Sequence, residues 1–256
     1  MCRLAAYAGP PLSLRQLLLA PPHSLYKQAY APAEMVSAVL NADGYGFGWY
    51  DDEQRPRIYT HTLPIWSDGN LPDLADSLSA RLWLANVRSA TPGQSVNLAN
   101  TQPFRAGPLM YLHNGFLQDF NSGLRTRFHE HLQADLSASL QGTTDSEYLF
   151  ALVRQHLRHT PDLGRALSTA LDELEDLLAG RQALLGIVMS DGDSLYAVRH
   201  GIGCAPPTMY VSDSDPDYAG GWLIASERLT EPRYWQTLTA GRVHRFSPGQ
   251  PLAASA

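Results

Sequence analysis

Cysteine is scarce in this chain, which has only Cys2 and Cys204 among 256 residues. It has no CxxC pair and no cluster of cysteine with histidine, so the sequence indicates neither a disulfide framework nor a zinc site. Such sparse use of cysteine fits a reducing compartment. We expect Cys204 to be a small buried filler, and we expect the protein to need no metal and no organic cofactor.

Positive charge and long apolar runs are also lacking. Nineteen Lys and Arg stand against 25 Asp and Glu, a formal net charge of −6. This balance argues against a nucleic-acid or acidic-membrane binder and favours a small-molecule partner. No stretch approaches the roughly eighteen apolar residues of a membrane span, and the apolar run at 4–8 is too short for a secretory signal. We therefore expect a soluble cytoplasmic protein.

The glycine-rich segment 41–50 lacks the features of a phosphate loop. Its glycines are not spaced as GxGxxG, and no Lys-Ser/Thr pair follows them. Glycines instead alternate with aromatic residues after a turn at Asp43-Gly44. This pattern predicts a strand to which another backbone comes close on one face.

The remaining patterns predict strands, then a pair of helices, then strands again. No repeat, linker or low-complexity segment interrupts them, so we interpret residues 1–256 as one α+β domain whose two sheets have helices packed outside. We predict further strands at 4–8, 57–63, 82–87, 108–112, 184–189, 195–198, 209–212, 222–226 and 242–246. We predict helices at 13–19, 71–82, 121–133, 148–157 and 163–178, an irregular segment at 23–41 and a disordered tail at 250–256.

The position of Cys2 makes it a candidate nucleophile. Aminopeptidases remove an initiator methionine when the next side chain is small, so we expect the mature chain to begin at Cys2. That residue then carries both a thiol and a free α-amine, whose reference pKa is about 7.7 to 8.0. The amine can take the thiol proton, which makes the sulfur a strong nucleophile. A cysteine in second position can also be accidental, so the rest of the chain has to decide.

Polar residues end two predicted strands, at Arg88 and at His113-Asn114-Gly115. The Asn114 amide and the Gly115 N–H could stabilise the oxyanion of a tetrahedral intermediate, although Asn-Gly is equally a hairpin turn. Arg88 offers a planar fork for a carboxylate or for a structural ion pair. Asp145 lies in the first turn of a helix, where a carboxylate is favoured whether or not it has a further role. Together, Arg88 and Asp145 would recognise the α-amino-acid end of a glutamyl group, and the attacked carbonyl would be its γ-carbonyl.

Five segments occur in the order of the motifs of class II glutamine amidotransferases, and the chain resembles that family of N-terminal nucleophile hydrolases. These segments are Met1-Cys2, 41–50, 87–91, 113–115 and 144–147. The resemblance implies a four-layer αββα sandwich with Cys2 as nucleophile and Asn114 with Gly115 as oxyanion hole. It also implies that Arg88 and Asp145 hold the glutamyl group. We count His113 with these two as a candidate substrate-binding residue.

Segments 20–25, 64–68 and 225–229 are similar to the stand-alone hydrolases of ergothioneine biosynthesis. This narrower resemblance implies release of glutamate from γ-glutamyl-hercynylcysteine S-oxide and no attached synthase domain. Segment 3–7 departs from the Arg-His start that is typical of that group. Two alternatives stay open, namely a glutaminase subunit that supplies ammonia to a separate synthase and a non-catalytic glutamate-sensing module.

Overall fold

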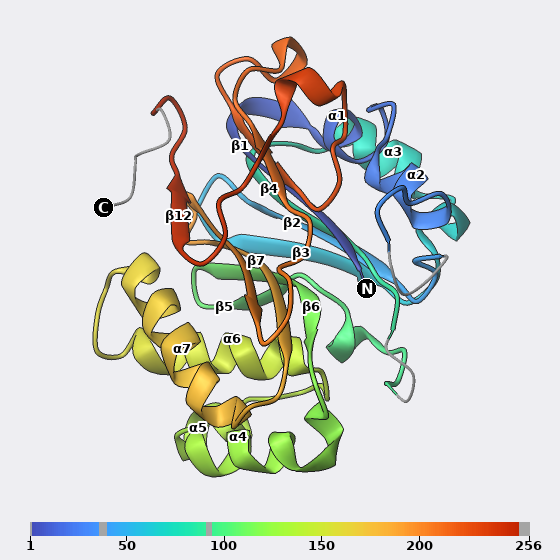
Figure 1. The fold of residues 1–256 in the computed structure, drawn as a ribbon. Coiled ribbons are helices and arrows are strands. Elements are labelled where there is room, and N and C mark those ends of the chain that lie inside the picture. Colours follow the sequence, from blue (N-terminus) through green and yellow to red (C-terminus); the bar gives the residue numbers. More distant parts are fainter. Residues whose placement is uncertain (1, 36–39, 91–93, 251–256) are drawn as a thin grey trace.

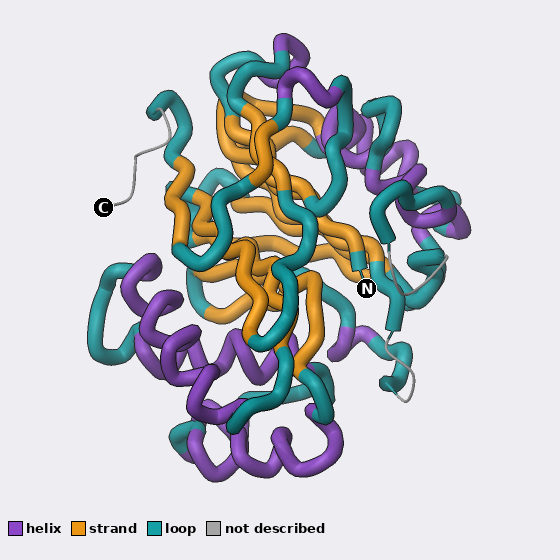
Figure 2. Tube along the Cα trace, in the orientation of Figure 1, coloured by secondary structure: helices purple, strands orange, loops and turns teal. Residues whose placement is uncertain are grey.

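The computed structural model describes residues 2–35, 40–90 and 94–250. Within them the strands form two antiparallel sheets, stacked face to face, with helices on the outer faces (Figures 1 and 2). The first sheet has the order β11-β9-β10-β1-β4-β2-β3 and the second has the order β12-β8-β7-β6-β5.

The first sheet consists of β1 (Arg3–Ser13), β2 (Tyr45–Tyr50), β3 (Pro56–His61), β4 (Ser79–Val87), β9 (Tyr210–Ser212), β10 (Trp222–Ala225) and β11 (Gln236–Thr237). The second consists of β5 (Phe104–Ala106), β6 (Leu109–Leu117), β7 (Ala183–Ser190), β8 (Leu195–Ile202) and β12 (Val243–Phe246). The first sheet is covered by α1 (Leu14–Leu18), α2 (Leu25–Tyr30) and α3 (Leu71–Ser77). The second is covered by α6 (Asp145–His156) and α7 (Leu163–Leu178), and α4 (Arg125–His131) and α5 (Ala134–Ala138) pack against α6.

The side chains of β1 point alternately to its two faces, and this shows how the layers are held together. Leu4, Ala6 and Ala8 belong to the core between the two sheets, whereas Ala5 and Tyr7 belong to the core under α1–α3. Successive strand residues point to opposite faces, so a strand that is apolar throughout serves both cores at once. A third core joins the second sheet to α6 and α7. The predicted four-layer αββα fold is confirmed.

Several predicted elements are confirmed with close bounds, above all α7 and the hairpin of β7 and β8. The helix predicted after Ser13 is also present as α1, with Ser13 and Gln16 forming its capping box. Thr144 caps α6 as expected, but the carboxylate of Glu147 accepts hydrogen bonds from Gln141 and Gly142 instead of closing the box.

Other predicted element bounds were wrong, because capping and strand pairing set the ends of these elements. Segment 23–41 is not wholly irregular, because Ser24 caps the helix α2. The helix predicted at 71–82 ends at Ser77, since β4 pairs with β1 from Ser79 onward. Strand β1 passes through Pro10 and Pro11 with a register irregularity between Ala8 and Leu12. Residues 36–39 of the segment predicted as irregular and residues 251–256 of the predicted tail lie outside the described residues.

In the described part of the chain, no helix combines the length and the apolar character needed to cross a membrane.

Candidate active site

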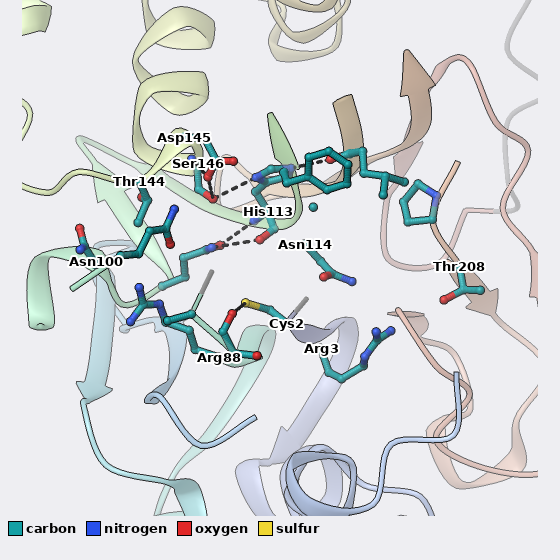
Figure 3. A pocket seen from close by; sticks show the side chains of 18 of the residues that line it. Cys2, Arg3, Arg88, Asn100, His113, Asn114, Thr144, Asp145, Ser146 and Thr208 are labelled. Carbon is teal, nitrogen blue, oxygen red and sulfur yellow. Dashed lines mark hydrogen bonds between the residues drawn. The ribbon is translucent and has the colours of Figure 1, made fainter. Parts of the chain in front are cut away.

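A cavity of about 750 Å³ lies where β1 and β4 of the first sheet approach β6 of the second. All six residues singled out from the sequence line it, namely Cys2, Arg88, His113, Asn114, Gly115 and Asp145. They come from segments far apart in the chain, and only the stacking of the two sheets brings them together (Figure 3).

Cys2 directly precedes β1 and is half-buried at the base of this cavity. The alternation that turns Leu4 and Ala6 towards the second sheet gives Cys2 the same orientation. Its Sγ lies 3.8 Å from the carbonyl oxygen of Ser89, just after β4. Met1 lies outside the described residues, so its removal stays a prediction.

Asn114 and Gly115 are part of a strand, so the hairpin-turn alternative is wrong, and so is the prediction that the strand ends before them. Both lie within β6, where they pair with Gly186 and Leu185 of β7. A Cβ atom on Gly115 would lie 1.8 Å from the Leu184 carbonyl oxygen and 2.5 Å from Nε2 of His113. Only glycine therefore fits at this position of the strand.

The free edge of β6 presents a row of N–H groups to the cavity. The N–H of His113 donates to Oε1 of Gln102 at 2.6 Å, and that of Leu117 donates to Oδ2 of Asp145 at 2.8 Å. In an antiparallel ladder, hydrogen-bonded and non-bonded residue pairs alternate along each strand. The N–H of Gln118, directly after β6, donates to the carbonyl oxygen of Gln182, directly before β7. By this alternation the Gly115 N–H points to the same free edge, between the two occupied groups. Among the described residues no acceptor is found against it.

The Asn114 side chain extends into the cavity beside Cys2 (Figure 3). It is 1% exposed, and its Oδ1 has no hydrogen-bond partner among the described residues. The Asn114 amide nitrogen and the Gly115 N–H are donors that line the same cavity as Cys2. An oxyanion hole needs two such donors, and this role of Asn114 and Gly115 stays a prediction.

His113 lines the cavity, but protein groups engage both of its ring nitrogens. Nε2 lies 3.0 Å from the Leu184 carbonyl oxygen and Nδ1 lies 2.9 Å from Oγ of Ser146. A carbonyl only accepts, so Nε2 carries the proton. The Ser146 hydroxyl also lies 3.3 Å from Oδ1 of Asp145, and its single proton can go to that oxygen or to Nδ1. Burial lowers the pKa of His113, against the opposing influence of Asp145. The imidazole is therefore neutral and fixed, which suits it to holding the strand edge in position.

Arg88 follows β4 and is 3% exposed. Its Nη1 and Nη2 donate at 3.3 Å to the carbonyl oxygens of Asp43 and Ser95. Burial lowers its pKa, whereas the nearby Cys2, Asp43 and Asp145 raise it, and a guanidinium stays charged throughout the ordinary pH range. Within the described chain no carboxylate forms an ion pair with Arg88, so its charge is available to a ligand.

Asp145 is the first residue of α6 and faces the cavity from the second sheet's side (Figure 3). Its Oδ1 accepts from the N–H of Ser146 and its Oδ2 accepts from that of Leu117, each at 2.8 Å. The Ser146 hydroxyl also lies 3.3 Å from Oδ1, whereas Oδ2 can accept a further hydrogen bond. The cavity thus offers an anion and a buried cation to one ligand.

The sequence analysis missed several residues that complete this site. Gln102 holds both the N–H and the carbonyl of His113. Asn100 joins the Ser95 carbonyl to the N–H of Thr143, just before α6. The Asn/Gln-rich composition of 97–104 was the only sign of either role. Arg3 and Thr208 line the cavity on the other side of Cys2 from Arg88 (Figure 3), and Glu34 lines it too.

Within residues 2–35, 40–90 and 94–250, no three His, Cys, Asp or Glu side chains gather as the ligands of a metal ion would.

The chain is similar to one known protein family and, over most of its length, to a characterised protein. Residues 30–206 match the model of the class II glutamine amidotransferases. The chain is 33% identical over 238 residues to the gamma-glutamyl-hercynylcysteine sulfoxide hydrolase of Mycolicibacterium smegmatis, a match that covers 93% of this chain and 92% of that protein.

Two solved structures share the fold. A glutamine aminotransferase class-II domain protein from Silicibacter pomeroyi superposes with a TM-score of 0.71 at 27% identity, covering 96% of this chain and 95% of that one. Glutamine phosphoribosylpyrophosphate amidotransferase of B. subtilis gives a TM-score of 0.66 at 14% identity, covering 96% of this chain and 47% of that one.

Proposed function

The chain belongs to the class II glutamine amidotransferases, and we propose that it is a hydrolase that releases glutamate from γ-glutamyl-hercynylcysteine S-oxide. The observation that carries the proposal is one cavity that combines the Cys2 thiol, the donors of Asn114 and Gly115, and the opposite charges of Arg88 and Asp145. The choice of substrate is supported by the near-complete match in length to the mycolicibacterial hydrolase.

In the proposed reaction, the α-amine of Cys2 becomes free when Met1 is removed and takes the thiol proton. The thiolate attacks the γ-carbonyl carbon, and the oxyanion accepts hydrogen bonds from the Asn114 amide and the Gly115 N–H. The C–N bond then breaks, and the leaving amine takes the proton from the α-ammonium group. Water attacks the γ-glutamyl thioester, which releases glutamate and restores the thiol.

Recognition of the glutamyl group follows from the two charges. Arg88 binds its α-carboxylate through the guanidinium edge, and Asp145 accepts from its α-ammonium group. Both residues are buried, so each interaction is stronger than it would be in water. The fixed positions of β4 and α6 orient the γ-carbonyl towards Cys2.

Glutamate release by the purified protein tests the choice of substrate. We expect kcat/KM for γ-glutamyl-hercynylcysteine S-oxide to exceed that for L-glutamine by about 10²-fold or more, because ammonia has no groups for the far end of the cavity to bind. Both substrates are assayed under identical conditions with the same glutamate readout. A preference for glutamine would favour a glutaminase that supplies ammonia to a partner synthase.

Replacing Arg88 by alanine should mainly weaken substrate capture. Loss of a buried charged partner costs about 3 to 4 kcal/mol, so we expect kcat/KM to fall by about 10² to 10³-fold, with most of the change in KM. Arg88→Lys is the matched control, because it keeps the charge but loses the fork, and it should recover only part of the loss. An unchanged KM in Arg88→Ala would exclude Arg88 from binding the substrate.

A further inference from the structure

A second buried arginine, Arg3, lines the cavity on the other side of Cys2 from Arg88 (Figure 3). Its side chain is 1% exposed. Nε and Nη2 are buried and have no hydrogen-bond partner among the described residues. Buried polar groups are normally hydrogen-bonded, and leaving buried N–H groups of a cation unpaired is costly. The Arg3 guanidinium therefore has N–H groups that no described protein group accepts from.

Glu227 forms a buried ion pair with Arg3, in which Oε1 lies 3.3 Å from Nε, but this contact is not a hydrogen bond and it leaves Nη2 unpaired. Glu227 already accepts from Nε2 of His23 at 2.7 Å and from the N–H groups of Ala33 and Glu34 at 2.8 and 3.0 Å. Burial acts to raise its pKa, yet these hydrogen bonds and Arg3 hold that pKa below the ordinary value. Glu227 thus anchors the chain around Ala33 and keeps Arg3 in position.

The other acidic residue at this end, Glu34, is also engaged. Its Oε2 accepts from the hydroxyl of Tyr210 at 2.7 Å, and its Oε1 lies 3.6 Å from Nη1 of Arg228. Arg228 in turn lies 3.9 Å from the centre of the Tyr210 ring. Glu34 therefore has its own cation, which leaves Arg3 able to attract an anion from the cavity.

The direction of the substrate follows from the proposed function. If Arg88 and Asp145 hold the amino-acid end of the glutamyl group, the leaving amine lies beyond Cys2, at the end where Arg3 stands. In a γ-glutamyl amide of an α-amino acid, the carboxylate is attached to the carbon that bears the leaving nitrogen. It is therefore the anionic group nearest to the scissile bond on that side.

We infer that Arg3 binds the α-carboxylate of the leaving group and thereby selects γ-glutamyl amides of α-amino acids over glutamine. The inference rests on the proposed function and narrows it. Arg3 lines the same cavity as the nucleophile, so the contact can form close to the reacting bond. Glutamine offers no such carboxylate, because its leaving group is ammonia. Arg3 thus discriminates a hydrolase of γ-glutamyl amino acids from a glutaminase.

The test compares γ-glutamyl-hercynylcysteine S-oxide with the derivative whose cysteine α-carboxylate is converted to an amide. We expect the wild-type protein to prefer the acid by about 10²-fold in kcat/KM, the size expected for a buried charge-assisted contact. Arg3→Gln should lower kcat/KM for the acid by a similar factor and leave that for the amide nearly unchanged. Arg3→Lys should keep part of the preference.

The possible results distinguish a failure of the role inferred for Arg3 from a failure of the proposed hydrolase function. Equal hydrolysis of acid and amide by the wild-type protein overturns the role of Arg3 alone, and this comparison needs no variant to fold. An equal loss on both substrates in Arg3→Gln would also overturn it, because a purely structural role predicts that result. Absence of glutamate release from acid, amide and glutamine alike would overturn the proposed function itself.

Discussion

Replacing Cys2 by alanine is expected to lower kcat for glutamate release by about 10⁴ to 10⁶-fold, the scale seen when a catalytic nucleophile is removed. The thiol is the atom that forms the proposed thioester, and no other cysteine lines the cavity within the described residues. Stability should change little. Cys2 precedes β1, is half-buried, and has one weak contact, at 3.8 Å to the Ser89 carbonyl.

Cys204→Ala is the matched control for this variant. Cys204 is the other free cysteine, and its Sγ lies 3.2 Å from the Ala183 carbonyl. We expect this variant to keep its activity and to lose only about 1 kcal/mol of unfolding free energy. Urea denaturation of both variants checks the fold. Retention of hydrolysis by Cys2→Ala would show that the nucleophile is another group.

The sequence predicted best what depends on local periodicity. Helix α7 runs from Leu163 to Leu178 as expected, because its apolar residues repeat at helical spacing and Asp162 caps it. The β7–β8 hairpin follows from two apolar runs around the turn at 191–193. The sequence predicts no helix in segment 23–41, because α2 is too short to show helical periodicity and its start depends on a single cap at Ser24.

The ends of strands depended on partners that are distant in the chain. Strand β6 continues through Asn114 and Gly115 because β7 pairs with it along its whole length. An Asn-Gly pair seen without that partner is equally well read as a turn. Pairing between β1 and β4 likewise set the end of α3.

The candidate site was predictable where a single residue type suggests its own chemistry. A cysteine in second position, an arginine after a core strand and a carboxylate at a helix start were visible in the sequence. Gln102 and Arg3 were not, because the role of each depends on a contact with a distant residue. Gln102 acts on His113, eleven positions away, and Arg3 is held by Glu227, near the other end of the chain.

A chain in which Cys2 is not the first residue should release almost no glutamate. Inserting lysine between Met1 and Cys2 would prevent removal of Met1, because the aminopeptidase needs a small side chain after the methionine. The Cys2 nitrogen would then be an amide, which cannot take the thiol proton. Loss of a general base costs about 10² to 10⁴-fold, so we expect a fall of that size in kcat with little change in KM.

The decisive version of this experiment uses one polypeptide in two forms. A removable N-terminal extension keeps Cys2 acylated, and a protease whose cut leaves Cys2 first then frees its amine in the same sample. Hydrolysis should appear only after the cut, and N-terminal mass measurement follows the cleavage. If the uncut form were active, the base would have to be another group of the cavity. His113 is poorly suited, because its Nδ1 lies 2.9 Å from Oγ of Ser146 and its Nε2 lies 3.0 Å from the Leu184 carbonyl oxygen. Asp145 and Glu34 would then be the residues to replace next.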